Sequence, residues 1–188
     1  MDEILKTPNL VLENELFKKR HIFLNSPIDF ELTEKINLML LNLESNSDSK
    51  PIFLHISSPG GIVYAGLSII DMIETINAPV YTYATGLVAS MAAIIFAVGD
   101  KRYMGKNTRY MIHQPSGGAI GKLSDMQTSI DEAIRLKEVT AEILADNSGK
   151  TPKDEILKML EKDCFLSSDE CLKLGFCDEI MTAKKVRI

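Results

Sequence analysis

The spacing of apolar residues alternates between helical and extended patterns along the first half of the chain. Over residues 29–44 apolar positions recur every three or four residues, which predicts an amphipathic helix capped by its first residue, Asp29. Residues 52–57 have the pattern of a strand, and helical spacing returns over residues 67–76. Residues 79–85 are rich in β-branched and aromatic side chains and predict a second strand, which Gly86 ends. This recurrence of strand and helix indicates an α/β fold with crossover connections.

The second half of the chain continues with shorter elements and one long helix. Small apolar residues over 90–98 predict a helix, and short strands are expected at 101–104 and 109–112. The longest helical pattern covers about residues 124–147 and follows a glycine-rich stretch. We expect this helix to project from the body as an arm.

Two further helix starts are indicated near the C-terminus. Thr151 followed by Pro152 has the pattern of a capping threonine with proline in the first turn. Ser167 or Ser168 begins another short helix, which ends at Gly175.

Length and charge favour one globular domain that does not bind nucleic acid. The 188 residues suffice for a single core over residues 1–188, with residues 1–19 as an N-terminal segment. The formal net charge is −5, and the basic clusters are only Lys18-Lys19-Arg20 and Lys184-Lys185. Nucleic-acid binding needs a concentrated basic face, so the charge argues against it. We interpret the basic triplet as a solvated turn before a strand.

Secretion, membrane insertion and metal binding are not indicated. The N-terminus lacks the positive segment and apolar segment of a secretory signal. The most apolar run, residues 89–98, is about half of the roughly 20 residues that span a bilayer. We therefore expect a cytoplasmic protein. Cys164, Cys171 and Cys177 fit no zinc spacing and are interpreted as reduced, mostly buried thiols.

Three histidines are candidates for acid–base chemistry. His21 follows the basic triplet and enters a strand, where a surface position is expected. His55 shares one face of its strand with Phe53 and Ser57. His113 ends an apolar strand and precedes a glycine-rich loop, a place where rigid scaffolds present functional groups.

Ser90, the glycine pair and Asp163 each have a structural and a chemical interpretation. Ser90 is either the cap of an apolar helix or a nucleophile whose oxyanion the helix N-terminus stabilises. Gly60-Gly61 is a tight turn, and its N–H groups could also meet a substrate carbonyl or pair with an extended peptide. Asp163 is a turn residue, or it orients the imidazole of His113 if folding joins the two. Spacing alone leaves these alternatives open.

Six segments together carry a family pattern. They are Arg20-His21-Ile22-Phe23-Leu24, Ile56-Ser57-Ser58-Pro59-Gly60-Gly61, Gly86-Leu87-Val88-Ala89-Ser90-Met91-Ala92, Met111-Ile112-His113-Gln114-Pro115, Lys162-Asp163-Cys164-Phe165-Leu166-Ser167 and Gly175-Phe176-Cys177-Asp178-Glu179-Ile180. In this order they resemble the ClpP family, the proteolytic subunits of the ATP-dependent Clp protease. The resemblance covers nearly all of the chain from about residue 16.

The resemblance implies a fold and a set of site residues. The fold would be ClpP/crotonase-like, built of repeated strand–helix units, with a handle of strand and helix at about residues 117–147. Ser90 would be the nucleophile, His113 the general base and then acid, and Asp163 the residue that orients the imidazole. The oxyanion hole would be formed by two backbone N–H groups, those of Gly61 and Met91. The substrate would be bound by Gly60, Gly61, Pro115 and Ser116.

The resemblance also implies an assembly. Family members form two stacked seven-membered rings around a chamber, into which AAA+ unfoldases thread unfolded polypeptides with ATP that the peptidase itself does not bind. We therefore expect no cofactor and no metal, and either a homo-oligomer or rings mixed with a ClpP homologue. The unfoldase would dock on a pocket that includes Phe53, His55, Tyr103 and Met181.

Several positions depart from the family pattern. Leu87 stands where glutamine is usual, Ala92 where glycine is usual, and Lys162 where arginine is usual. His55 and Thr75 occupy docking positions that are commonly aromatic. The segment ahead of the first strand, which normally forms axial pore loops, is shorter than usual.

Two alternatives stand beside the leading hypothesis of a serine endopeptidase subunit. The first is a weakly active structural or regulatory subunit that assembles with an active homologue, as the departures suggest. The second is a crotonase-type acyl-coenzyme A enzyme. That superfamily shares the general fold and a backbone oxyanion hole, but it usually relies on carboxylates.

Overall fold

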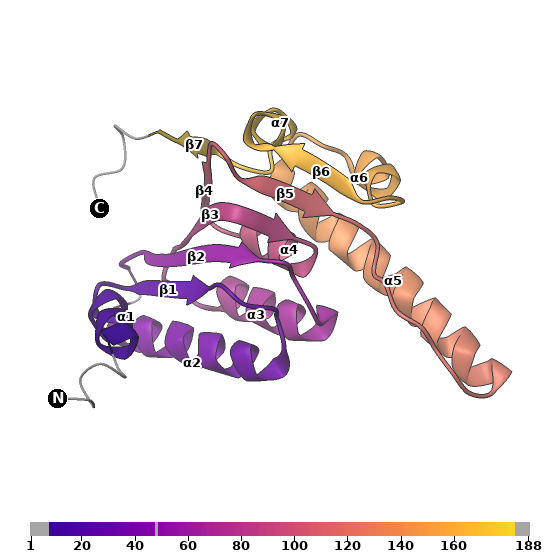
Figure 1. Cartoon of the computed structure of the whole chain (residues 1–188), viewed down its shortest axis with the longest axis horizontal. Coiled ribbons are helices and arrows are strands. Elements are labelled where there is room, and N and C mark those ends of the chain that lie inside the picture. Colours follow the sequence, from indigo (N-terminus) through magenta and orange to yellow (C-terminus); the bar gives the residue numbers. More distant parts are fainter. Residues whose placement is uncertain (1–7, 48, 183–188) are drawn as a thin grey trace.

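A seven-stranded, mostly parallel sheet forms the centre of the computed structural model, which describes residues 8–47 and 49–182 (Figure 1). The strands are ordered β1-β2-β3-β4-β7, while β5 pairs with β3 and β6 pairs antiparallel with β5. Parallel neighbours need crossover connections, and helices supply them, so the predicted α/β layering is confirmed. The strands are β1 (His21–Leu24), β2 (Ile52–Ser58), β3 (Val80–Ala89), β4 (Lys101–Gly105), β5 (Arg109–Ile112), β6 (Cys164–Ser167) and β7 (Glu179–Met181).

Helices cover one face of this sheet and form an arm beside it (Figure 1). Their bounds are α1 (Pro8–Lys18), α2 (Phe30–Asn46), α3 (Val63–Thr75), α4 (Met91–Ala97), α5 (Leu123–Ser148), α6 (Lys153–Met159) and α7 (Ser168–Leu174). Among the described residues, no helix combines the length and apolar character needed to cross a membrane. Helix α1 and strands β6 and β7 were not predicted from the sequence.

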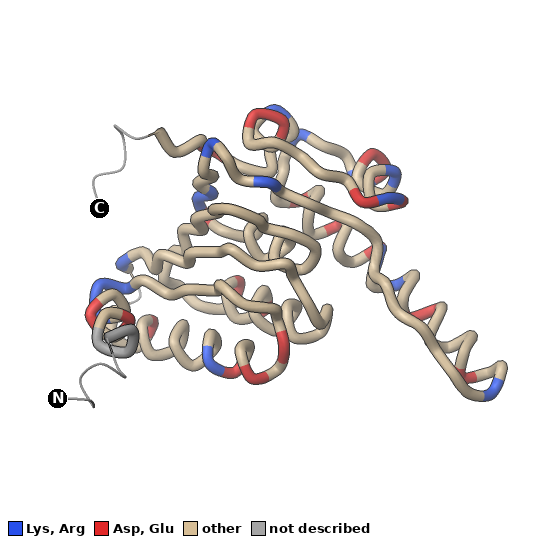
Figure 2. The backbone as a smooth tube through the Cα atoms, viewed as in Figure 1, with Lys and Arg blue, Asp and Glu red and all other residues tan. Residues whose placement is uncertain are grey.

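Side chains alternate across the strands between the helix-covered face and the open face. In β2, Leu54 and Ile56 are fully buried, whereas Phe53 and His55 are only partly buried. The predicted alternation is therefore confirmed. Each aliphatic side chain that is fully buried in this way stabilises the fold by about 1.5–3 kcal/mol. Charged residues are correspondingly sparse along the central strands and gather on the helices and at the periphery (Figure 2).

Strand β3 does not end at Gly86, so that prediction was wrong. Gly86 has a φ of 64°, which bends the strand, yet pairing continues beyond it. Before the bend, Tyr81–Ala84 pair with β4; after it, Leu87–Ala89 pair with β5. The sequence marked the bend, but pairing with β5 and β2 beyond it determines that the strand resumes.

Two of the three predicted helix caps are confirmed. The Asp29 carboxylate accepts a hydrogen bond from the Leu32 N–H at 2.8 Å, and Ser167 forms a reciprocal capping box with Glu170. The predicted Thr151 cap was wrong, because its hydroxyl donates to the Leu174 carbonyl at 2.7 Å and Pro152 takes the cap position. Thr151 instead ties the start of α6 to the end of α7.

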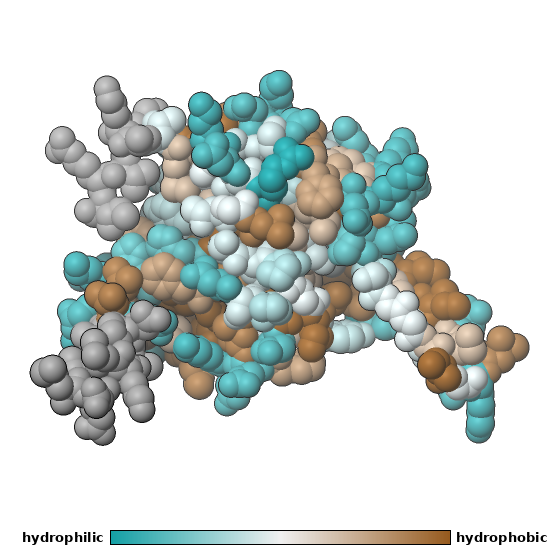
Figure 3. All heavy atoms as spheres, in the orientation of Figure 1, coloured by the Kyte–Doolittle hydropathy of each residue, from teal (hydrophilic) through white to brown (hydrophobic). Residues whose placement is uncertain are grey.

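The long helix α5 leaves the body as a projecting arm, as expected (Figure 1). Residues 117–122 pair with no strand in the part of the chain that the structure describes, so the handle strand expected ahead of α5 stays a prediction. At the base of the arm, the Tyr64 hydroxyl of α3 donates to Glu132 at 2.5 Å. Apolar side chains gather on the arm (Figure 3); those exposed are Ile120, Leu123, Met126, Ile130 and Ile134.

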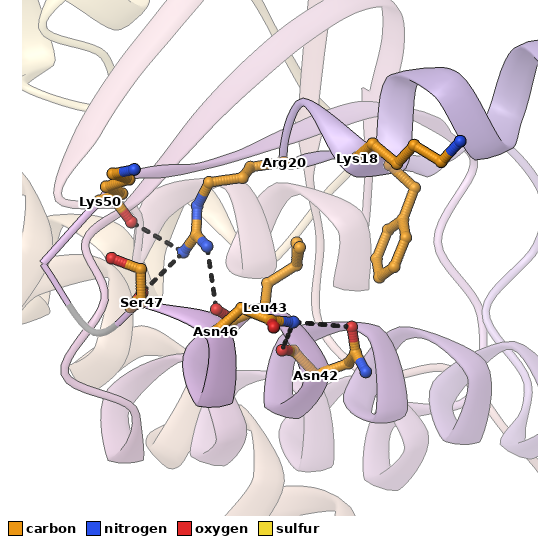
Figure 4. Close-up of a pocket in the computed structure, with 8 residues that line it drawn as sticks. Lys18, Arg20, Asn42, Leu43, Asn46, Ser47 and Lys50 are labelled. Atoms are coloured by element: carbon orange, nitrogen blue, oxygen red, sulfur yellow. Dashed lines mark hydrogen bonds between the residues drawn. The ribbon is translucent and has the colours of Figure 1, made fainter.

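Arg20 has a structural role that the solvated-turn interpretation of the basic triplet missed. It has a φ of 71°, and its guanidinium donates hydrogen bonds to four backbone carbonyls, three of which are drawn in Figure 4 with Pro51 left out. These carbonyls belong to Leu43, Ser47, Lys50 and Pro51. Leu43 lies in the last turn of α2, where a cation is favourable, and the other three carbonyls belong to the segment between α2 and β2.

Candidate active site

Ser90 stands between strand β3 and helix α4 in a backbone conformation rare for a residue with a side chain. Its φ of 54° and ψ of −126° place it outside the helical and extended regions. Its N–H donates to the Met111 carbonyl at 2.8 Å, which fixes the turn against β5. Such strain costs about 1–3 kcal/mol and is found mainly at functional sites.

The Ser90 hydroxyl makes no hydrogen bond to the backbone of α4, although the residue occupies the cap position. Instead, Ser90 Oγ lies 2.9 Å from Nε2 of His113. Of the two interpretations of this serine, the geometry therefore favours the nucleophile over the helix cap.

His113 joins Ser90 to Asp163 in one chain of polar contacts. It follows strand β5, and its Nδ1 lies 3.2 Å from Oδ1 of Asp163, which precedes strand β6. Antiparallel pairing of β5 with β6 places Ile112 opposite Cys164, and so brings the two residues together from 50 positions apart. The Asp163 side chain is 65% exposed against 24% for His113, so solvent weakens their attraction.

The glycine turn at residues 60 and 61 lies directly against the nucleophile. A Cβ added to Gly60 would lie 2.8 Å from Ser90 Cβ and 2.9 Å from the Met91 nitrogen. The turn is held from the other side, where the Ile28 N–H donates to the Gly60 carbonyl at 2.9 Å. Met91 is the first residue of α4, so its N–H has no acceptor within the helix. The two predicted oxyanion-hole residues thus belong to adjacent segments.

The other predicted substrate-binding residues follow His113 in the chain. Pro115 lines a small cavity with Ser90 and His113, whereas Ser116 is exposed. Another cavity, of about 360 Å³, lies elsewhere, between α1 and the end of α2 beside Arg20 (Figure 4). None of the predicted site residues lines it, so we do not assign it a role in the chemistry.

The predicted docking residues lie on the open face of the sheet, where aromatic rings stack from strand to strand. Phe53 stacks on His21 with ring centroids 4.8 Å apart, and Tyr103 stacks on Tyr83 at 4.8 Å. Met181 pairs with Gly105 at the sheet edge. The sequence prediction missed four members of the stack, although their alternation in β1 and β3 marks them: His21, Phe23, Tyr81 and Tyr83.

Two histidines meet within this stack. His21 Nδ1 lies 2.8 Å from His55 Nε2, so one ring donates the proton and the other accepts it. Burial, and then the neighbouring His21, lower the pKa of His55 to about 4. Burial likewise lowers the pKa of His21, with Lys19 adding to the effect. Both rings are therefore largely neutral at pH 7.

The three cysteines are free thiols, and two of them are fully buried. Burial raises the pKa of Cys177 to about 11 and that of Cys171 further. Cys164, beside Asp163, is partly buried, and burial raises its pKa too. The interpretation as reduced, mostly buried thiols is confirmed.

Comparison with known proteins decides the family. The family model described as Clp protease matches residues 8–184. This chain belongs to the Clp protease family. Curated relatives in Streptococcus mutans and Streptococcus suis, each 40% identical over 178 residues, cover 93% of this chain and 90% of their own length. Both are named ATP-dependent Clp protease proteolytic subunit, which supports the peptidase hypothesis over the crotonase alternative.

Proposed function

We propose that this chain is a serine endopeptidase subunit of an ATP-dependent Clp protease, acting in the cytoplasm on unfolded polypeptides. The observation that carries the proposal is the chain of contacts from Ser90 Oγ through His113 to Asp163. Ser90 lies at the N-terminus of α4 and against the glycine turn. Both elements carry backbone N–H groups of the kind that bind the oxyanion when an acyl group is transferred to a serine.

The proposed reaction begins when Ser90 Oγ attacks a peptide carbonyl carbon while Nε2 of His113 takes the hydroxyl proton. Asp163 holds the imidazole in the tautomer with the proton on Nδ1 and stabilises the imidazolium. The N–H groups of Gly61 and Met91 bind the oxyanion. The tetrahedral intermediate collapses as His113 protonates the leaving amine, and a water that His113 activates then releases the acyl group from Ser90.

Substrate would bind as an extended strand between the glycine turn and the segment after His113. Gly60 and Gly61 would offer backbone groups on one side, and Pro115 and Ser116 would line the other. Hydrogen bonds to the substrate backbone depend little on the substrate's side chains, so this mode of binding suits unfolded polypeptides of varied sequence.

The proposed partners fit two surfaces. The AAA+ unfoldase would dock on the aromatic face, at Phe53, His55, Tyr103 and Met181. The exposed apolar side chains of the arm are the kind of surface that other subunits cover, which supports stacked seven-membered rings. These rings are either homomeric or mixed with a ClpP homologue.

The regulatory-subunit hypothesis is the second candidate, and one observation favours it. The Asp163 carboxylate is mostly exposed and 3.2 Å from His113, so it orients the imidazole weakly. A subunit with such a site would contribute mainly to the assembly of a mixed ring.

Labelling with a fluorophosphonate, read by intact mass, tests the proposal. The purified chain should gain one adduct, whereas Ser90→Ala should gain none and His113→Ala should react at least about 10³-fold more slowly. Ser45→Ala, which removes an exposed serine of α2 that belongs to no part of the proposed site, is the matched control and should label like the unaltered chain. Absence of any adduct, alone and with an active homologue added, would refute the peptidase proposal and favour the regulatory subunit.

A further inference from the structure

The two histidines on the open face of the sheet bring ring nitrogens together from neighbouring strands. His21 of β1 pairs with Phe53, and His55 of β2 pairs with Phe23, so the two imidazoles are diagonal neighbours. Their facing atoms, Nδ1 of His21 and Nε2 of His55, lie 2.8 Å apart. The proposed peptide cleavage uses neither ring, since its general base is His113.

Aromatic neighbours hold both imidazoles by their flat faces. His21 stacks on Phe53 with ring centroids 4.8 Å apart. His55 stacks on Phe23 of β1 at 4.8 Å and on Tyr83 of β3 at 5.1 Å. Rings that are already held in place lose little conformational freedom when a ligand binds, which favours binding.

The spacing of the two nitrogens fits one kind of metal geometry. Imidazole nitrogens bind divalent transition ions at about 2.0 Å, so two of them at a right angle are about 2.8 Å apart, and two at a tetrahedral angle are about 3.3 Å apart. The observed 2.8 Å matches the right angle. Right angles occur in square-planar and tetragonal coordination, which Cu²⁺ and Ni²⁺ adopt, whereas structural Zn²⁺ sites are tetrahedral.

The pair would exchange its hydrogen bond for the ion. One facing nitrogen now carries a proton and the other accepts it. On binding, the first ring gives up that proton and takes one from water on its outer nitrogen, and both rings turn their facing lone pairs toward the ion. Histidine ligands must be neutral. Burial lowers the pKa of both rings, that of His55 to about 4, so both meet this condition at pH 7.

Water would complete the coordination. Among the described residues, no three side chains of His, Cys, Asp or Glu lie together as a metal site, so a closed four-ligand site is not available in this part of the chain. Both histidines are only partly buried, on the face of the sheet that the helices do not cover (Figure 1). An ion held by the two nitrogens would therefore be open to water on its outer side.

We propose that His21 and His55 form a two-histidine site for Cu²⁺ or Ni²⁺ on the open face of the sheet, with water in the remaining positions. The site is separate from the proposed peptidase function and does not depend on it. It departs from the expectation of no metal that the family resemblance implied. The reason is His55, which stands at a position that is commonly aromatic in the family.

Electron paramagnetic resonance of bound Cu²⁺ tests the proposal, because nitrogen ligands in the equatorial plane split the copper signal. The purified chain should bind one Cu²⁺ and show two such nitrogens. His21→Phe and His55→Phe each keep a ring in the stack and remove one ligand. Each should show at most one nitrogen and bind Cu²⁺ at least about tenfold more weakly by calorimetry.

Two control variants locate the ion. His113→Ala removes the third histidine of the chain and should keep the signal with two nitrogens. Tyr103→Phe alters the same open face without removing a histidine and should bind Cu²⁺ like the unaltered chain. Zn²⁺ should bind the unaltered chain at least about tenfold more weakly than Cu²⁺. Melting temperatures of the variants show that each one is folded.

Several results would overturn the site. Absence of Cu²⁺ binding would do so, and so would a two-nitrogen signal and an affinity that survive in both His21→Phe and His55→Phe. A signal that is lost only in His113→Ala would move the ion to the candidate active site. Zn²⁺ that binds as tightly as Cu²⁺ would contradict the right-angle geometry. Fluorophosphonate labelling of Ser90 is measured without metal, so its outcome and that of the metal experiments are independent.

Discussion

The two halves of strand β3 contribute to two different surfaces of the molecule. Before Gly86 the strand pairs with β2 and β4, and it carries Tyr81 and Tyr83 on the open face. After Gly86 it pairs with β5 and leads to Ser90. The first half builds the proposed docking face through a repeated pattern of side chains. The second half builds the candidate active site by placing one residue between segments that are distant in sequence.

This difference predicts that the two regions tolerate substitutions to different degrees. Stacked rings on a sheet face contribute additively, so replacing one ring with another of similar shape should cost little. An active-site residue must keep its position to within about 0.5 Å, and misplacement by about 1 Å can cost 10²-fold in rate. The predictions below test this contrast, from the largest expected effect to the smallest.

Of the variants that test this contrast, Gly60→Ala should have the largest effect, because it changes the turn facing Ser90. Its φ is 89°, and the added Cβ would lie 2.6 Å from the Ala89 carbonyl oxygen and 2.9 Å from the Met91 nitrogen. Because backbone atoms must shift, we expect fluorophosphonate labelling of Ser90 to slow by about 10²-fold or more.

The control for this variant is Gly149→Ala. Gly149 also has a positive φ, 62°, but a Cβ there would meet nothing within 4 Å. It should cost about 1–2 kcal/mol in unfolding free energy and leave labelling unchanged. Equal loss of labelling in both variants would show that backbone strain, rather than the contact with the nucleophile, is responsible.

A smaller effect is expected from His55→Phe on the docking half. The pKa of a histidine in the unfolded chain is about 6.5, and in the fold that of His55 is about 4. As the pH falls from about 6.5 to 4, the unfolded chain binds a proton that the folded chain does not, so stability is lost. Allowing for partial exposure, the loss is about 1–2 kcal/mol.

Urea unfolding at pH 7 and pH 4.5 measures this dependence. His55→Phe keeps a ring in the stack and should lose less stability than the unaltered chain between the two pH values. Tyr103→Phe, which also keeps its ring but removes no histidine, should behave like the unaltered chain. An identical pH dependence in His55→Phe would show that His55 does not account for the loss.

The smallest effect should come from Leu87→Gln, which restores the residue usual in the family. Leu87 lies beyond the bend in β3 but is 40% exposed, and substitutions at such positions change stability by about 0.5 kcal/mol or less. Labelling of Ser90 and the melting temperature should both stay close to those of the unaltered chain. A labelling rate raised by tenfold or more would show that this departure restrains the site.

The hydrophobic pattern predicted the elements that form from local spacing. Helices α2, α3, α4 and α5 and strands β2, β4 and β5 lie where the pattern placed them, within a few residues. The residue types and their order also pointed to the Clp protease family, which the comparisons confirm. Local periodicity and motif order are properties of the chain itself, so one sequence suffices for them.

Only the tertiary structure determined the contacts between segments that are distant in sequence. Resumption of β3 after Gly86 depends on β5, and the Thr151 hydroxyl bonds to Leu174 rather than capping α6. The choice between cap and nucleophile for Ser90 depends on where His113 lies, and the place of Asp163 depends on β5 pairing with β6. Hydrogen bonds and close contacts act over a few ångströms in space, whereas these partners stand some 20 to 50 residues apart in the chain.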